Sequence, residues 1–202
     1  MNTTGDANRS VRRTKGKLRE ALITLMLEKP IKDISVREIA DCADVSRGTF
    51  YLYYRDVYDM VEKLQSALLE GLTEITERAD PRAQNAAFKI ILSTLQLVRR
   101  EGDLFQALLG PNGSQEFTDG MSAVLSCPLE DSIRPFAAGE GELRLVNAFF
   151  MKGFLGLIGE WLRGGLKETP ENIAAVVSNL LRQVQSDLPR GRAGTQAASS
   201  AG

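Results

Sequence analysis

Histidine is absent from the 202-residue sequence, and cysteine occurs only twice, as Cys42 and Cys127. Histidine is the commonest general base and the commonest transition-metal ligand, so its absence argues against triad catalysis and metal sites. Two cysteines make no disulfide framework, and we expect Cys42 to be a small buried residue of a helix. We therefore predict a protein that is not an enzyme and uses no metal or cofactor. An all-α enzyme would be left with carboxylate or tyrosine chemistry.

Long apolar runs and a secretion signal are also missing. No apolar run reaches the length that a membrane span needs. The N-terminal segment MNTTGDANRSVRR lacks the apolar core of a signal peptide. Hydrophobic residues make up 43% and charged residues 25%, which is ordinary for a soluble globular protein. We expect a cytoplasmic protein without a membrane partner.

The net charge of −1 hides an uneven distribution of charge along the chain. Residues 9–55 contain 11 Lys and Arg against 6 Asp and Glu, whereas residues 56–202 contain 14 against 19. A basic N-terminal quarter on an acidic body is typical of a DNA-reading head joined to a separate body. A solvated basic surface would give the same balance, so charge alone does not decide between them.

Apolar periodicity predicts an all-α fold, and we find no convincing strand. The expected helices lie at about 15–28, 47–53, 56–79, 82–101, 103–109, 114–138, 142–163 and 170–188, and one more short helix begins at residue 36. Pro128 must cap or kink the helix at 114–138. We divide the chain into a flexible tail at 1–10, a helix-turn-helix DNA-binding domain at 11–55, a helical regulatory and dimerisation domain at 56–188, and a disordered tail at 189–202.

The segment from Ile34 to Tyr54, ISVREIADCADVSRGTFYLYY, has the pattern of two short helices joined by a tight turn. Ser35 to Glu38 fits a capping box, and Ser46 fits the N-cap of the second helix. In a helix-turn-helix the second helix enters the major groove with its N-terminus at the base edges. Arg47 could then pair with guanine, and Thr49 could offer its hydroxyl or meet a thymine methyl.

Other residues around this segment suit the DNA backbone. Gly48 lacks a side chain and permits close approach. Phe50 and Tyr54 fall on one face and are expected to form the core under the helix, which leaves Tyr51, Leu52 and Tyr53 to face DNA. The start of the first short helix, with Ser35 and Arg37, commonly abuts a phosphate. The basic arm with Arg12, Arg13 and Lys15 would follow the backbone or the adjacent minor groove.

Residues 14–64 resemble the DNA-binding domain of the TetR family of transcriptional regulators. The resemblance rests on the helix that ends near Glu28, the ISVREIA segment and the VSRGTFYLYY run that leads into a long helix. It implies a homodimer, a palindromic double-stranded DNA operator and a C-terminal helical domain that receives a small-molecule ligand.

Two positions depart from the family pattern. Asp44 replaces the usual glycine of the turn, and Val57 replaces a lysine that commonly holds phosphate; Arg55 could compensate. The predicted DNA-binding residues are Arg12, Arg13, Lys15, Ser35, Arg37, Ser46, Arg47, Gly48, Thr49, Tyr51, Leu52, Tyr53 and Arg55.

The segment at 145–162, LVNAFFMKGFLGLIGEWL, is apolar around most of its circumference, so it must be covered on both sides. The chain's own helices could cover it, but a two-fold dimer would also double the DNA readout. The run FFMKGFLGLIGEWLRGGLKETPENIA resembles a TetR subgroup that includes regulators of dihydroxyacetone kinase operons. That resemblance implies dimerisation through helices 142–163 and 170–188 as a four-helix bundle.

Apolar residues of the body could line a ligand pocket, although each could equally pack in the core. The candidates are Phe88, Leu92, Leu95, Phe105, Leu108, Met121, Leu125, Phe150, Phe154 and Trp161. A mechanism consistent with the family is a ligand that favours one spacing of the two recognition helices, transmitted by helix 56–79. The leading hypothesis is a dimeric repressor. The alternatives are an activator, or a ligand- or protein-sensing module with weakened DNA readout.

Overall fold

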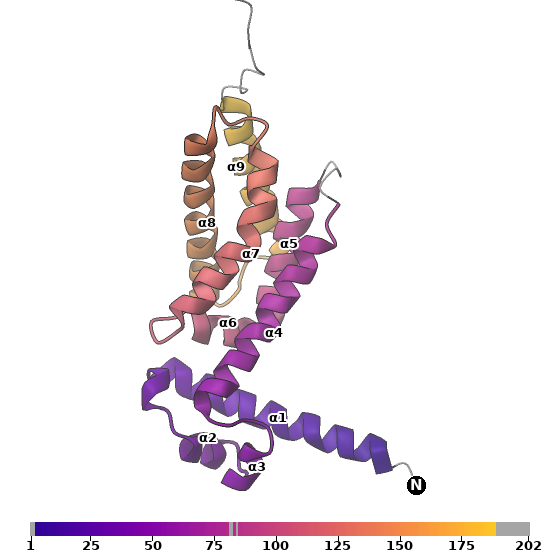
Figure 1. Cartoon of the computed structure of the whole chain (residues 1–202), viewed down its shortest axis with the longest axis vertical. Helices are drawn as coiled ribbons and strands as arrows, with labels where there is room; N and C mark the ends of the chain where they lie inside the picture. Colours follow the sequence, from indigo (N-terminus) through magenta and orange to yellow (C-terminus); the bar gives the residue numbers. More distant parts are fainter. Residues whose placement is uncertain (1–2, 81–82, 84, 189–202) are drawn as a thin grey trace, which may run out of the picture. The chain divides into compact units, whose positions relative to one another are not determined.

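The computed structural model describes residues 3–80, 83 and 85–188, and within them every regular element is helical (Figure 1). The predicted all-α fold is therefore confirmed. The elements are α1 (Thr3–Glu28), the short 3-10 helix η1 (Ile31–Asp33), α2 (Val36–Cys42), α3 (Arg47–Tyr51), α4 (Val57–Glu77), α5 (Ala86–Arg100), α6 (Gly102–Leu109), α7 (Gln115–Ile133), α8 (Glu140–Arg163) and α9 (Pro170–Asp187).

Most helix ends lie where the sequence places them, but α1 is longer than expected. It begins at Thr3 instead of near Lys15, so residues 3–10, expected as a flexible tail, are part of the helix. Pro128 lies inside α7, which continues to Ile133. The tail expected at 189–202 falls outside the described residues.

The chain forms two compact units, and the division differs from the boundary expected at residue 55. Of the described residues, the first unit contains 3–71 and 100–121, and the second contains 72–80, 83, 85–99 and 122–188. Each unit is thus built from two separate stretches of chain, and the boundaries fall within α4 and α7 and at the last residue of α5.

The first unit has a single core beneath the helix-turn-helix. In this unit α1 packs against α2 and α6, and α2 packs against α3. Side chains of α1, α2, α3, α4, α6 and α7 that are almost inaccessible to solvent form this core: Leu18, Leu22, Met26, Ile39, Phe50, Met60, Phe105, Leu108, Phe117 and Met121. The rings of Phe105 and Phe117 lie 5.7 Å apart between centres. Helix α6 therefore packs against the DNA-binding helices of this unit, and its residues Phe105 and Leu108 belong to their common core.

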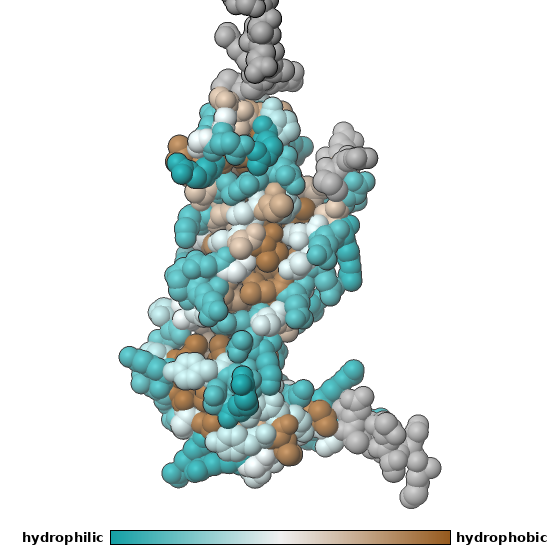
Figure 2. All heavy atoms as spheres, in the orientation of Figure 1, coloured by the Kyte–Doolittle hydropathy of each residue, from teal (hydrophilic) through white to brown (hydrophobic). Residues whose placement is uncertain are grey.

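The second unit consists of α5, α8, α9, the end of α4 and most of α7. Its core includes Leu95, Ile133, Leu143, Ile158 and Leu181. On the face seen in Figure 2, hydrophobic side chains are visible between hydrophilic ones, so these helices do not cover all of their own apolar surface.

Helix α8 is less covered by the rest of the chain than its composition would require. Leu145 is 69% exposed and Phe149 is 75% exposed. Within the described residues α8 is also the one helix long and apolar enough to cross a membrane by length and composition, contrary to the expectation that no segment would be. A single such helix is weak evidence for a span, because the core helix of a soluble protein passes the same test.

Candidate nucleic-acid interface

Helix α2 begins at a complete capping box. Ser35 Oγ accepts a hydrogen bond from the Glu38 backbone N–H at 3.3 Å, and Glu38 Oε2 accepts one from the Ser35 N–H at 3.0 Å. Lys29 Nζ lies 2.5 Å from Glu38 Oε1. The hydrogen bonds from Lys29 and Ser35 lower the pKa of Glu38 to about 2. The caps fix the N-terminus of α2, which carries Ser35 and the exposed Arg37.

The turn between α2 and α3 is a Schellman motif with Asp44 at its left-handed position. Val45 N–H donates to the Ala40 carbonyl at 3.0 Å, and Asp44 N–H donates to the Asp41 carbonyl at 3.3 Å. Asp44 has φ 53°, a conformation in which glycine is preferred at this position. Its carboxylate also lies 3.7 Å from Lys17 Nζ. The aspartate therefore adopts the geometry of the family glycine.

Helix α3 presents its N-terminus to solvent. Ser46 Oγ accepts a hydrogen bond from the Thr49 N–H at 3.0 Å, and the two hydroxyl oxygens lie 2.8 Å apart. Arg47 is exposed and has no hydrogen-bond or ion-pair partner within the described part of the chain. A Cβ added at Gly48 would meet only Ser46 Oγ, at 3.6 Å. Nothing in its own unit therefore requires glycine at position 48.

The aromatic residues of α3 and the following turn divide between the core and the surface, as the spacing predicts. Phe50 is fully buried and Tyr54 is 7% exposed, with their ring centres 5.5 Å apart. In contrast, Tyr51 and Leu52 are exposed and Tyr53 is half-buried. The ammonium of Lys15 lies 5.5 Å from the centre of the Tyr53 ring. Lys15 of the basic arm and Tyr53 of the turn after α3 are thus neighbours.

A buried carboxylate at the start of α4 holds two cations, Arg55 and Lys63, of which only Arg55 was predicted to contact DNA. Asp59 is 6% exposed, and it accepts hydrogen bonds from Arg55 N–H and from Lys63 Nζ. These two bonds lower the pKa of Asp59 to about 2. Val57 is 6% exposed and belongs to the core. Positive charge at this junction therefore comes from Arg55 and Lys63. Each lies four residues from Asp59, and this spacing is the sequence pattern from which the two ion pairs could have been predicted.

The remaining predicted contacts lie on the surface of the same unit. Arg12 and Arg13 are exposed on α1, and Arg37 pairs with Asp41 at 3.5 Å on α2. Cys42, expected to be buried, is exposed because it lies two residues beyond the core residue Ala40, on roughly the opposite side of α2. The structure therefore brings every predicted DNA-contacting residue into one unit and leaves the cations accessible.

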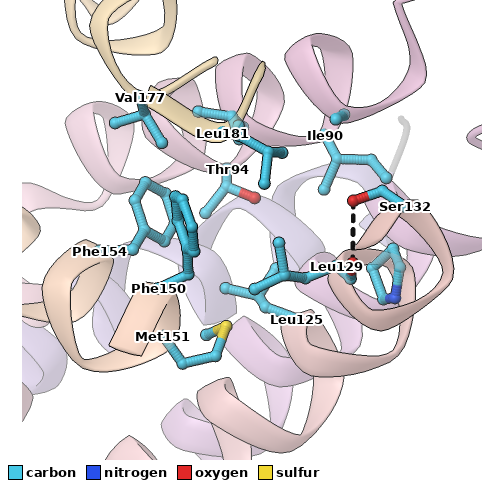
Figure 3. A pocket seen from close by; sticks show the side chains of 13 residues that line it. Ile90, Thr94, Leu125, Leu129, Ser132, Phe150, Met151, Phe154, Val177 and Leu181 are labelled. Carbon is cyan, nitrogen blue, oxygen red and sulfur yellow. Dashed lines mark hydrogen bonds between the residues drawn. The ribbon is translucent and has the colours of Figure 1, made fainter. Parts of the chain in front are cut away.

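The predicted ligand pocket is only partly assembled. Leu125, Phe150 and Phe154 line a cavity in the second unit together with other residues of α5, α7, α8 and α9 (Figure 3). Phe105, Leu108 and Met121 belong to the core of the first unit, and Leu95 is fully buried without lining the cavity. Trp161 packs at the end of α8, where its Nε1 donates to the Glu168 carbonyl at 3.1 Å. Phe88 lines a separate groove, and Leu92 is half-buried outside the cavity.

Two family models match the chain. Residues 18–64 match the model described as "Bacterial regulatory proteins, tetR family", and residues 85–183 match a "Transcriptional regulator C-terminal region". The chain is also 26% identical over 173 residues to the "Uncharacterized HTH-type transcriptional regulator YxbF" of Bacillus subtilis. That match covers 82% of the chain but only 44% of the relative, so the chain spans less than half the length of that protein.

Several solved structures share the fold. The "Dihydroxyacetone kinase operon activator DhaS" matches with a TM-score of 0.59 and 16% identity, covering 87% of this chain and 98% of that one. NalD, "the secondary repressor of MexAB-OprM multidrug efflux pump in Pseudomonas aeruginosa", matches with a TM-score of 0.66 and 18% identity, covering 87% and 96%. At these identities the likeness establishes the fold alone.

Proposed function

We propose that this chain, which belongs to the TetR family of bacterial regulatory proteins, is a sequence-specific transcriptional regulator that binds a palindromic operator as a homodimer. The observation that carries the proposal is the exposed N-terminus of α3. Arg47 is unpaired there, and Gly48 leaves room for a close neighbour. A free guanidinium at the start of a recognition helix is the group that pairs bidentately with guanine.

Backbone contacts would come from the cations around this helix. Arg12, Arg13 and Lys15 extend along α1, and Arg55 stands at the α3–α4 junction with its side chain 81% exposed. Phosphate contacts of this kind fix the register of a protein on the duplex without reading sequence. They also make affinity strongly dependent on salt.

The weakened-readout alternative rested on Asp44 and Val57. Asp44 has the left-handed backbone that the turn requires, and Val57 is buried while Arg55 and Lys63 supply charge nearby. These observations favour a functional DNA-binding head.

Dimerisation is supported by an exposed apolar face on α8 and α9. Leu145 and Phe149 lie one turn apart on α8, and Val176 and Leu180 lie one turn apart on α9; all four are more than half exposed. A Cβ added at Gly153 or at Gly156 would meet nothing within 4 Å, so α8 is open to close approach there. An exposed patch of large apolar side chains is characteristic of protein interaction sites. We assign this face to a second copy of the chain, packed as a four-helix bundle.

The proposed regulator responds to a small molecule and acts as a repressor. A ligand bound in the second unit would favour one of two spacings of the recognition helices, and it can shift that equilibrium only by its differential affinity for the two states. The repressor assignment follows the common family mechanism. An activator would share the same DNA-binding head and the same ligand site.

Fluorescence anisotropy with a duplex from the chain's own promoter tests the DNA-binding proposal. We expect tight, salt-sensitive binding to this duplex and weak binding to a scrambled duplex of equal length. Arg47→Ala should cost roughly 1–3 kcal/mol and relax one base preference, whereas Arg13→Ala should weaken both duplexes about equally. Equal wild-type affinity for the two duplexes would refute sequence-specific regulation.

A further inference from the structure

The second unit contains a cavity of about 60 Å³, partly open to solvent, between α5, α7, α8 and α9. Figure 3 shows Ile90 and Thr94 from α5, Leu125 from α7, and Phe150 and Phe154 from α8 arranged around it. A cavity needs roughly 10–15 Å³ of such space to hold one water, so this one has several times the space that a single water needs.

Thr94 supplies an unsatisfied hydroxyl to the wall of this cavity. Its side chain is fully buried, and its Oγ1 has no hydrogen-bond partner in the described part of the chain. A buried polar group without a partner lowers stability, and native proteins seldom retain one without a reason. The other hydroxyl in the wall, that of Ser132, donates to the Leu129 carbonyl at 2.8 Å. Thr94 is therefore the wall's free polar side-chain group.

Water is a poor occupant for such a space. An ordered internal water usually makes about three hydrogen bonds, and apart from Thr94 and Ser132 the side chains of the wall are apolar. Among the described residues no charged side chain lines the cavity, so an ionised ligand group that entered it would lose its hydration without compensation. The wall is therefore suited to apolar ligand groups, except at Thr94, where a polar group of the ligand could form a hydrogen bond.

We propose that this cavity binds a small, uncharged, largely apolar molecule with one hydroxyl or carbonyl group, which hydrogen-bonds to Thr94 Oγ1. The inference deepens the ligand response proposed above and rests on it for its regulatory meaning. Ala87 and Ser132 line this cavity and also two grooves on the outer surface. Because these two residues are shared between the cavity and the surface, we place the entrance beside them. Charged residues line the outer grooves, Arg182 in one and Glu77 and Asp131 in the other.

Titration of the full chain with a homologous series measures the chemistry of the site. Calorimetry or ligand-observed NMR with butan-1-ol through octan-1-ol should show affinity rising roughly fourfold per methylene until the cavity is filled. The matched carboxylates, butanoate through octanoate, should bind at least tenfold more weakly at pH 7. Absence of alkanol binding, or tighter binding of the carboxylates, would overturn the proposal.

Variants of Thr94 separate a ligand contact from a structural role. Thr94→Val keeps the shape and removes the hydroxyl, so alkanol affinity should fall roughly five- to tenfold while the affinity for the 1-chloroalkane of equal length stays the same. The melting temperature without ligand should stay level or rise, because an unsatisfied group has been removed. Thr94→Ser should keep the preference for the alcohol over the chloroalkane. A Thr94→Val variant that binds alkanols as the wild type does would refute the contact.

Filling the cavity gives an independent test of location. Ala87→Phe places a ring at the entrance and should abolish binding of the whole series, whereas Ala123→Phe places the same ring on an exposed face of α7 outside the cavity and should not. Circular dichroism melting confirms that both variants fold. Equal alkanol binding by the two variants would place the ligand elsewhere.

Operator affinity measured with and without saturating octan-1-ol distinguishes the two proposals. Alkanol binding that leaves operator affinity unchanged would uphold the site and refute its regulatory role. Normal operator affinity in a chain that binds no alkanol would refute the site and leave the DNA-binding function intact.

Discussion

The carboxylate of Asp59 holds Arg55 by two separate hydrogen bonds, one from the backbone N–H at 3.0 Å and one from Nε at 3.2 Å. Asp59 is 6% exposed, whereas the Arg55 side chain is 81% exposed. Lys63 donates to the same carboxylate at 2.8 Å and to the Tyr53 carbonyl at 3.2 Å. One buried acid therefore fixes two cations at the junction that follows the recognition helix.

This junction should make the stability of the head depend on pH. The Lys63 hydrogen bond, followed by the Arg55 N–H, lowers the pKa of Asp59 to about 2, and the ordinary value is 3.8. A depressed folded-state pKa gives stability that is present above about pH 4 and is lost as the pH falls toward 2. Glu38, whose pKa is also about 2, contributes in the same window. We expect Asp59→Asn to be less stable at pH 7 and to lose part of this acid dependence.

Urea unfolding followed by circular dichroism at pH 7, 4, 3 and 2.5 measures how the free energy of unfolding changes with pH. The matched control is Asp41→Asn, which breaks the exposed pair with Arg37 and should change stability little. Parallel curves for wild type and Asp59→Asn would contradict the assigned role of Asp59.

Gly48→Ala should separate stability from DNA binding. Alanine is about 1 kcal/mol better than glycine in a helix interior, and its Cβ would make only an ordinary contact with Ser46. The free energy of unfolding should therefore stay level or rise. Operator affinity should fall about tenfold or more, because the new methyl group occupies space that DNA would fill.

Chemical denaturation and anisotropy on the same preparations measure the two effects. Gly141→Ala, at an open position in the first turn of α8, is the control and should leave operator affinity unchanged. Full operator affinity in Gly48→Ala would show that α3 does not approach DNA closely at this position.

Apart from α1, local signals in the sequence predicted the helix starts to within a few residues. Ser35 and Ser46 were expected as caps, and each accepts a hydrogen bond from a backbone N–H three residues ahead. A cap depends only on neighbours in the chain, so a short stretch of sequence is sufficient to find it. The division of aromatics between Phe50 and Tyr51 follows from helical periodicity in the same way.

Features that depend on which helices pack together were predicted less well. Cys42 was expected in the core, but the orientation of α2 against α1 leaves it exposed. Phe105 was a pocket candidate, yet α6 packs on α1 and buries that ring beside Phe117. Thr94 was not predicted at all, because an unsatisfied hydroxyl can be recognised only when all of its neighbours are known.

Substitutions at Asp44 should show that the turn requires a left-handed backbone conformation at this position. Its φ of 53° costs most non-glycine residues free energy, and β-branched residues most of all. We expect Asp44→Gly to stabilise the protein by about 0.5–1 kcal/mol and Asp44→Val to destabilise it by about 1–2 kcal/mol. Lys17→Ala removes only the exposed pair with Asp44 and should change stability by less than about 1 kcal/mol. Urea midpoints measure all three, and equal stability of the glycine and valine variants would contradict the conformational role.

Phe149→Glu should dissociate the proposed homodimer. Phe149 is 75% exposed on α8, and Leu145 precedes it by one turn. In the proposed dimer the Phe149 ring of one copy would be buried against the exposed apolar face of the other copy. A carboxylate placed there on both copies would be desolvated without a partner, a cost that a non-covalent interface does not tolerate. Sedimentation velocity should show a dimer for the wild type and a monomer for the variant. Leu27→Glu, at an exposed apolar position on α1, is the matched control and should stay dimeric.

The same variant also tests why a dimer is needed. One recognition helix covers only a few base pairs, so a monomer with an intact head should keep weak, salt-sensitive binding and lose most of its preference for the full palindrome. On a duplex with a single half-site the wild type and Phe149→Glu should then bind with similar affinity. A monomeric variant that retained the full operator affinity would show that pairing through α8 and α9 does not contribute to DNA recognition.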